Sequence, residues 1–158
     1  MRSKRANTIA RLEAGATIEQ LVNRIEEVVD ELEQAAFIAS LLPEDTGADL
    51  LKPLTELGAA ALAGTETAAA GVDAASEVPE GHRVDSEDAL AAVGRLIDLE
   101  HKADDTERIV TTQVLRGKID LPHSLAALEL ARALERATDR LACFGHLLRA
   151  HVLADLAS

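Results

Sequence analysis

The sequence predicts an all-α protein, folded as an antiparallel up-and-down bundle of four long helices. Ala and Leu, two of the strongest helix formers, dominate its 158 residues, of which 47% are hydrophobic. Apolar residues recur with the 3.6-residue period of an amphipathic helix, in segments separated by Pro and Gly. No segment alternates with the period of two that a strand requires. Length and composition suit a single domain over 1–158 with an aliphatic core.

The first helix is expected to begin at Thr17 and to reach Leu42. Thr17 and Gln20 have the spacing of a capping box, and the apolar residues beyond them follow helical spacing: Ile18, Val22, Ile25, Val29, Leu32 and Ala36. The polar segment 1–16 is expected either to fray or to form a short extra helix. Residues 43–47, Pro-Glu-Asp-Thr-Gly, then end the first helix.

The second helix is expected to run from about Ala48 or Lys52 to Glu77. Pro53 favours a start close to it, because proline fits the first turn of a helix and not its interior. Small residues make up most of the apolar stripe, which favours close packing against neighbouring helices: Leu54, Leu57, Ala61, Gly64, Ala68, Val72 and Ala75. Residues 78–82 are expected to form the next loop.

The last two helices are expected over about 85–116 and 120–154. Asp85 or Ser86 is expected to cap the third helix, and Gly117 is expected to break it. Pro122 then fits the first turn of the fourth. Short loops between four long helices are typical of an up-and-down bundle.

Charge and cysteine content narrow the classes of function. The formal charge of −12 disfavours nucleic acid and anionic membranes as partners. The single cysteine, Cys143, excludes an intrachain disulfide and is compatible with a reducing compartment. No apolar run follows the basic N-terminus, and no stretch approaches the roughly 20 apolar residues of a spanning helix. We therefore expect a soluble, cytoplasmic protein without a membrane insertion.

Carboxylates four residues apart occur three times behind an apolar residue on the expected helices. The pairs are Glu26 with Asp30, Glu100 with Asp104, and Glu135 with Asp139. Residues at this spacing share one face of a helix, about a turn apart. Because like charges so placed repel each other, the pairs indicate a metal ion or a basic partner.

The positions of these carboxylates on the helical wheel support a site. Glu100 and Glu135 lie within apolar stripes, where an isolated carboxylate costs several kcal/mol unless it is paired, protonated or metal-bound. His146 shares the face of Asp139 and can join Glu135 along one wall. The alternative is a charged seam between helices, in which arginines neutralise the carboxylates: Arg24, Arg95, Arg108, Arg132 and Arg140.

The same helices resemble those of PhoU-like regulators of phosphate transport. Residues 96–108, L-I-D-L-E-H-K-A-D-D-T-E-R, resemble the I-x-x-L-E-x-x-A-D-x-x-x-R helix of that family. Residues 134–140 resemble its L-E-x-x-x-D helix, and residues 25–33 are similar to its L-D-D-I-L-D-x-I-E helix. The order and spacing of these motifs match over roughly 18–152.

The resemblance implies a non-enzymatic accessory protein that regulates a phosphate permease. It also implies that E/D-x-x-x-D motifs hold a divalent metal ion: Fe, Zn, Mn, Mg or Ca. Together with His146 from the wheel analysis, the expected ligands are Glu26, Asp30, Glu100, Asp104, Glu135 and Asp139. This chain is shorter than the usual member and lacks the first helices of the N-terminal repeat. That truncation and the small-residue stripe of the second helix predict exposed apolar surface and therefore a homodimer.

Other functions are compatible with the same composition. A di-iron enzyme on a helical bundle uses Glu-x-x-His motifs, which this sequence lacks. A nucleotide pyrophosphohydrolase bundle uses Glu-x-x-Glu and Glu-x-x-Asp pairs, a spacing that Glu27 and Asp30 have and Glu100 with Ala103 does not. The third alternative is a purely structural helical adaptor that binds a basic partner through an acidic face.

Overall fold

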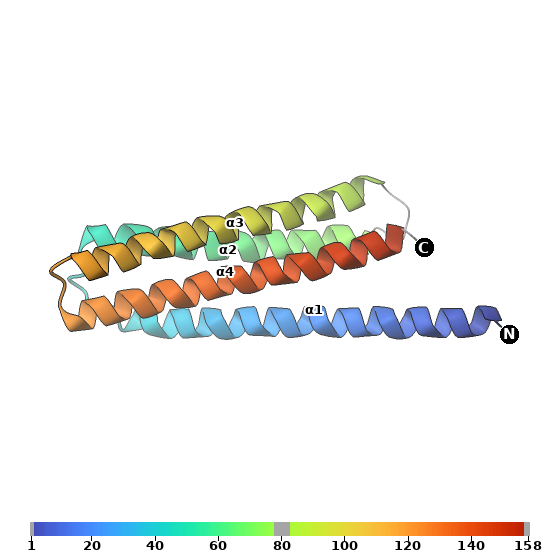
Figure 1. Cartoon of the computed structure of the whole chain (residues 1–158), viewed down its shortest axis with the longest axis horizontal. Helices are drawn as coiled ribbons and strands as arrows, with labels where there is room; N and C mark the ends of the chain where they lie inside the picture. The colour runs from blue at the N-terminus through green and yellow to red at the C-terminus, as the bar shows by residue number, and fades with distance from the viewer. Residues whose placement is uncertain (1, 78–82, 157–158) are drawn as a thin grey trace.

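The part of the chain that the structure describes folds into four long helices, as the sequence predicts (Figure 1). The computed structural model describes residues 2–77 and 83–156, and the side chains within them except those of 2–14, 16, 77, 83–85 and 155. The helices are α1 (Arg2–Ser40), α2 (Ala48–Glu77), α3 (Arg83–Arg116) and α4 (Leu121–Leu156). Within the described residues there is no strand, and no helix is long and apolar enough to cross a membrane.

The start of α1 corrects a sequence-based expectation. The helix begins at Arg2, so the described residues before Thr17 neither fray nor form a separate helix. Thr17 lies inside α1 and does not cap it. The physical reason is that residues 2–16 contain one glycine and no proline. A single interior glycine such as Gly15 costs only about 1 kcal/mol relative to alanine and does not end a helix of this length.

The position of Pro53 is a second correction. α2 begins at Ala48, the earlier of the two expected starts, so Pro53 is the sixth residue of the helix rather than part of its first turn. The N–H groups of Leu50 and Leu51 already donate to the carbonyl of Gly47, at 3.0 and 3.1 Å. Pro53 removes one helical hydrogen bond, to the carbonyl of Asp49. Asp49 is exposed, so water can satisfy that carbonyl.

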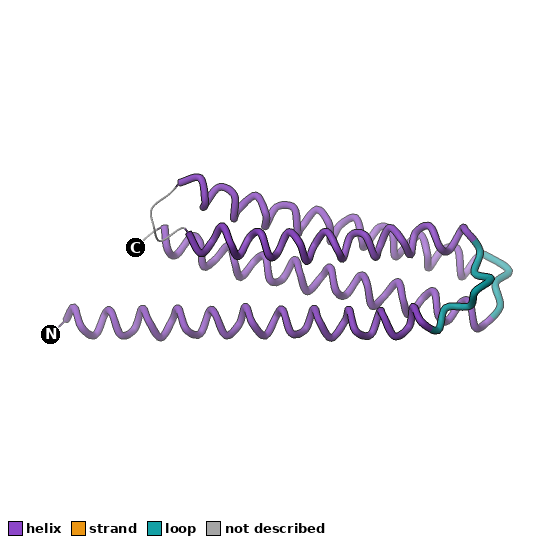
Figure 2. Tube along the Cα trace, turned by 180° about the vertical axis from the view of Figure 1, so that it is seen from behind, coloured by secondary structure: helices purple, strands orange, loops and turns teal. Residues whose placement is uncertain are grey.

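α4 is the central helix of the bundle. α2 and α3 pack along each other and both pack on α4, whereas α1 packs on α4 alone. Among the described residues, no Cα atom of α1 lies within 8 Å of a Cα atom of α2 or α3. Figure 2 shows the first turns of α1 extending beyond the end of α4. One side of the four-helix bundle, between α1 and α2, is therefore open.

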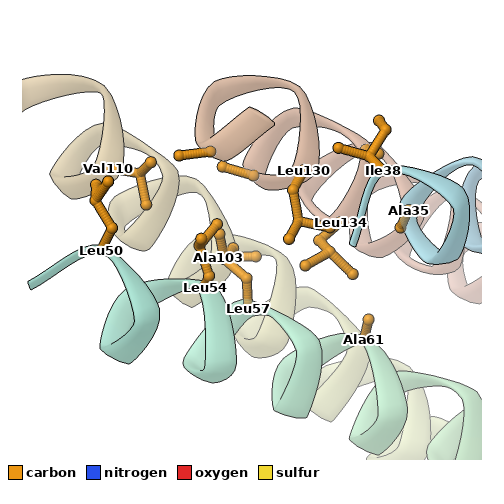
Figure 3. Close-up of a cluster of buried hydrophobic side chains, with 13 residues drawn as sticks. Ala35, Ile38, Leu50, Leu54, Leu57, Ala61, Ala103, Val110, Leu130 and Leu134 are labelled. Atoms are coloured by element: carbon orange, nitrogen blue, oxygen red, sulfur yellow. The ribbon is translucent and has the colours of Figure 1, made fainter. Parts of the chain in front are cut away.

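Two clusters of aliphatic side chains form the core. Near the α1–α2 and α3–α4 loops, leucines of α2 and α4 pack with Val110 and small residues of α1 and α3 (Figure 3). The second cluster surrounds Phe144 towards the other end. The small-residue stripe of α2 is buried except for Val72, and its buried Leu and Ala residues belong to these clusters. The buried part of the stripe therefore does not supply the exposed apolar surface that was expected from it.

Candidate functional site

Arginines of α4 and carboxylates of α1 form a charged seam between these two helices. Arg136 Nε donates to Glu31 Oε2 at 2.9 Å. Glu27 Oε2 accepts a hydrogen bond from Arg24 Nη1 at 2.7 Å and lies 3.5 Å from Arg140 Nε. Hydrogen bonding and charge from Glu27 raise the pKa of the Arg24 guanidinium. The α1 carboxylates that reach α4 are thus a paired set, already neutralised by arginine.

The acidic pair predicted on α1 lies one residue away from this seam. Glu26 and Asp30 are exposed, and Glu26 borders the open side of the bundle instead of facing arginines of α4. A step of one residue turns a helical side chain by about 100°. Glu27 and Glu31 have the same i, i+4 spacing as the predicted pair, so the spacing alone does not separate the two sets.

A second group of carboxylates lies between α3 and α4. We call it the acidic seam: Asp104 and Glu107 on α3 and Glu135 and Asp139 on α4, all partly buried. Burial raises the pKa of the Glu135 carboxyl, and the negative charges of Asp139, Asp104 and Glu107 raise it further. Arg136 opposes this shift. The acidic seam therefore brings one predicted pair, Glu135 with Asp139, close to Asp104 of a second pair, whereas Glu100 is not part of it.

Two side chains donate hydrogen bonds to carboxylates of the acidic seam, and one of them, Arg108, also brings a positive charge. Arg108 donates hydrogen bonds to Asp104, one turn before it, and to Asp105 at 3.0 Å. Thr111 Oγ1 donates to Glu107 Oε1 at 2.8 Å. Glu107 was not singled out from the sequence, although it lies three residues after Asp104 and seven after Glu100, on the same side of α3.

The seven residues predicted as metal ligands do not surround a common point where a metal ion fits. Among the described residues, no three His, Cys, Asp or Glu side chains are arranged to hold a metal ion. Glu100 is partly buried with a carboxylate oxygen 3.4 Å from His101 Nε2, and His146 is exposed on α4. The donor types are those that hard divalent cations prefer, but their arrangement is not that of a formed site. Metal binding by the seven predicted residues stays a prediction.

His123 forms a contact that the sequence did not indicate. Its Nδ1 lies 2.7 Å from Asp120 Oδ1, and its Nε2 lies 3.0 Å from Asp45 Oδ1 in the α1–α2 loop. The backbone N–H of His123 also donates to Asp120 Oδ1, at 3.1 Å, so Asp120 caps α4. The signal available in the sequence was the Asp-x-x-His spacing at a helix start. The ring links the two loops at one end of the bundle.

The open side of the bundle forms an apolar groove between α1 and α2, with α4 as its floor. Two hollows of about 450 and 410 Å³ share Ile25 and Val72 and together form this groove. Leu141, Phe144 and Leu148 of α4 contribute to the floor. The aliphatic stripe of helical spacing found in the sequence of α1 lines one wall and is exposed: Ile18 by 55%, Val22 by 51%, Ile25 by 37% and Val29 by 46%.

Fold and surface together define the chain as a four-helix bundle with an acidic seam and an open apolar groove. No protein-family model, curated protein or solved structure matches it. The arrangement of its own side chains therefore carries the functional argument.

Proposed function

We propose that this chain is a PhoU-like, non-enzymatic accessory protein of the cytoplasm that regulates a phosphate permease. The order of the acidic motifs along the chain supports this proposal, because the motifs fall on α1, α3 and α4 of one helical bundle. The observation that carries it is the acidic seam, where partly buried carboxylates of two helices lie together, and where burial and their charges raise the pKa of Glu135. A bound cation relieves the repulsion between such carboxylates. The proposal therefore includes a divalent metal ion in the acidic seam.

The metal part of the proposal is tested by thermal unfolding with and without divalent cations. A cation that binds the folded state raises the melting temperature by mass action. We expect a rise with at least one of Fe²⁺, Mn²⁺, Zn²⁺, Ca²⁺ or Mg²⁺ in the wild type and none in Glu135→Gln. Glu129→Gln is the matched control, because Glu129 lies on the same helix and pairs with Arg132. Its melting temperature should respond to cations as the wild type does.

The melting temperature of Glu135→Gln is also informative in cation-free buffer, where the substitution is expected to raise it. The folded-state pKa of Glu135 is raised, so its contribution to stability is present below the unfolded-state pKa and is lost as pH rises through the folded-state value. Above that folded-state value, the charged Glu135 therefore opposes folding. Glu135→Gln should melt at a higher temperature than the wild type under these conditions. A lower melting temperature would contradict the arrangement of charges described above.

The regulatory part of the proposal needs a cellular measurement. Removing the gene from its source organism should change the uptake of labelled phosphate, and the wild-type gene should restore it. Unchanged uptake at both limiting and abundant phosphate would overturn the proposed role. The cation and uptake experiments are independent, since a regulator can act without a metal ion.

A structural helical adaptor is the second candidate. The observation that favours it is the neutralisation of carboxylates by arginines, at Glu27 and Glu31 on α1 and at Asp104 on α3. If no divalent cation moves the melting temperature of the wild type, the acidic seam acts as a structural charge network. The adaptor is then the better description.

A further inference from the structure

We infer that the groove between α1 and α2 is a docking site for a basic amphipathic helix of a partner protein. The inference does not rest on the proposed function, and it uses side chains outside the acidic seam. It is carried by the shape of the groove, by the spacing of its aliphatic residues, and by the charges at its rim.

The α1 helix has two apolar faces but one helical neighbour. Val28, Ala35 and Ile38 are buried towards α4. The stripe of Ile18, Val22, Ile25 and Val29 lies roughly 100° around the helix from that face. A surface helix with one neighbour needs one apolar face, so the second face is available for another element. Its successive spacings of four, three and four residues are those of a helix-packing seam.

The groove has the dimensions of a helix-binding site. It extends along α1 from Ile18 to Leu32, which corresponds to about 21 Å at 1.5 Å per residue. Its walls come from α1 and from Val72 and neighbouring residues of α2, and its floor comes from α4. Helix-in-groove recognition uses such a trough, in which apolar side chains at i, i+3, i+4 and i+7 are buried.

The charges at the rim select the class of partner. Two of the residues that line the two hollows are Asp, Glu, Lys or Arg: Glu26 on α1 and Asp73 on α2. Both are acidic, and the whole chain carries a formal charge of −12. A helix with Lys or Arg beside its apolar face therefore matches the rim, whereas an acidic helix is repelled by it.

The same charges disfavour a second copy of α1 as the occupant. Exposed Glu19, Glu26 and Glu33 follow one edge of the aliphatic stripe at seven-residue spacing. A second α1 laid in the groove would bring the same edge against Glu26 and Asp73, and like charges in such positions are destabilising. The rim thus distinguishes between self-association and a basic partner.

The test uses a labelled 18-residue Leu/Lys peptide with leucines at helical spacing, about 27 Å long when helical. Fluorescence anisotropy with the full chain should show saturable binding that weakens as salt is raised. Val22→Gln with Ile25→Gln should weaken binding roughly tenfold or more, because apolar anchors dominate such interfaces. Both residues are substantially exposed, so the double variant should fold, and its helical circular dichroism verifies this.

Matched controls separate the groove from general stickiness. Leu62→Gln removes an exposed leucine of α2 that does not line either hollow, and it should bind the peptide as the wild type does. Glu26→Gln with Asp73→Asn should weaken binding and reduce its salt dependence. Asp49→Asn, an exposed acid outside the groove, should change neither.

Three outcomes overturn the inference. The first is equal binding by the wild type and by Val22→Gln with Ile25→Gln. The second is equal binding of a twin peptide in which every Lys is Glu. The third is a wild-type dimer that these groove substitutions dissociate, since the occupant is then a second copy. If the peptide experiment fails but divalent cations still raise the melting temperature, the proposed function stands without the docking site. If the peptide binds as expected but no cation raises the melting temperature, the docking site stands on its own.

Discussion

At the residue scale, the carboxylates that meet a helical neighbour differ from some of those predicted. On α1, Glu27 and Glu31 reach the arginines of α4, while the predicted Glu26 and Asp30 are exposed. The sequence specifies the spacing, but the side of α1 that is covered depends on which helix packs against it. With α4 as its one neighbour, that side is set by tertiary packing.

His123 makes a prediction about pH. Both ring nitrogens face carboxylates, an arrangement in which both donate in the protonated imidazolium. The hydrogen bond to Asp120 raises the pKa of His123, with a further contribution from Asp45, and His123 in turn lowers the pKa of Asp120. The His123 contribution to stability is thus present below its unfolded pKa of about 6.5 and is lost as pH rises through the folded value. The Asp120 contribution is lost as pH falls through its lowered pKa.

We therefore expect the melting temperature to decrease between about pH 6 and 8 more steeply in the wild type than in His123→Gln. His101→Gln is the control, because His101 is exposed on α3 and lies away from both loops. It should retain the wild-type slope. Parallel pH profiles for the wild type and His123→Gln would show that the contacts with Asp45 and Asp120 do not raise the pKa of His123 on folding.

At the element scale, local signals in the sequence account for most of the fold. Breakers such as Pro43 and Gly117 mark where helices end, and helical periodicity marks which segments are helices. The predicted start of α1 at Thr17 was wrong, because residues with the spacing of a capping box also occur within continuous helices. The open groove was not predicted, because periodicity shows that α1 has an apolar stripe but not whether a neighbour covers it.

Two glycines in helices should respond in opposite ways to alanine. Gly94 on α3 is exposed, and a Cβ atom there would meet nothing within 4 Å. Gly94→Ala should raise the free energy of unfolding by about 0.5–1 kcal/mol through helix propensity. At Gly71 on α2, a Cβ would lie 3.1 Å from Ala92 Cβ and from Leu148 Cδ2. Ala92 Cβ is fixed to the backbone of α3, so α2 and α3 must separate.

Such overpacking costs roughly 1–3 kcal/mol, which exceeds the gain in helix propensity, so Gly71→Ala should lower the free energy of unfolding. Urea unfolding followed by circular dichroism measures both variants against the wild type. Equal stabilisation by the two substitutions would show that α2 does not approach α3 and α4 as closely as described. A loss of stability in Gly94→Ala would contradict the open surroundings of that residue.

At the scale of the whole molecule, two groups of exposed apolar side chains are relevant to association. One lines the groove between α1 and α2, and the other lies near the loops, where Phe37, Leu41, Leu121 and Leu125 are exposed. Monomeric proteins rarely leave large contiguous apolar patches uncovered. Because the rim of the groove is acidic, the surface near the loops is the better candidate for contact between two copies.

We predict a homodimer in which this second surface takes part. Light scattering at micromolar concentration should give about twice the chain mass of 16.7 kDa. Leu125→Gln should shift the mass towards the monomer, because it replaces an exposed apolar side chain with a polar one and leaves the buried core intact. Val22→Gln, in the groove, should leave the dimer unchanged. A monomer mass for the wild type would exclude the dimer, and dissociation by Val22→Gln but not by Leu125→Gln would place the contact in the groove instead.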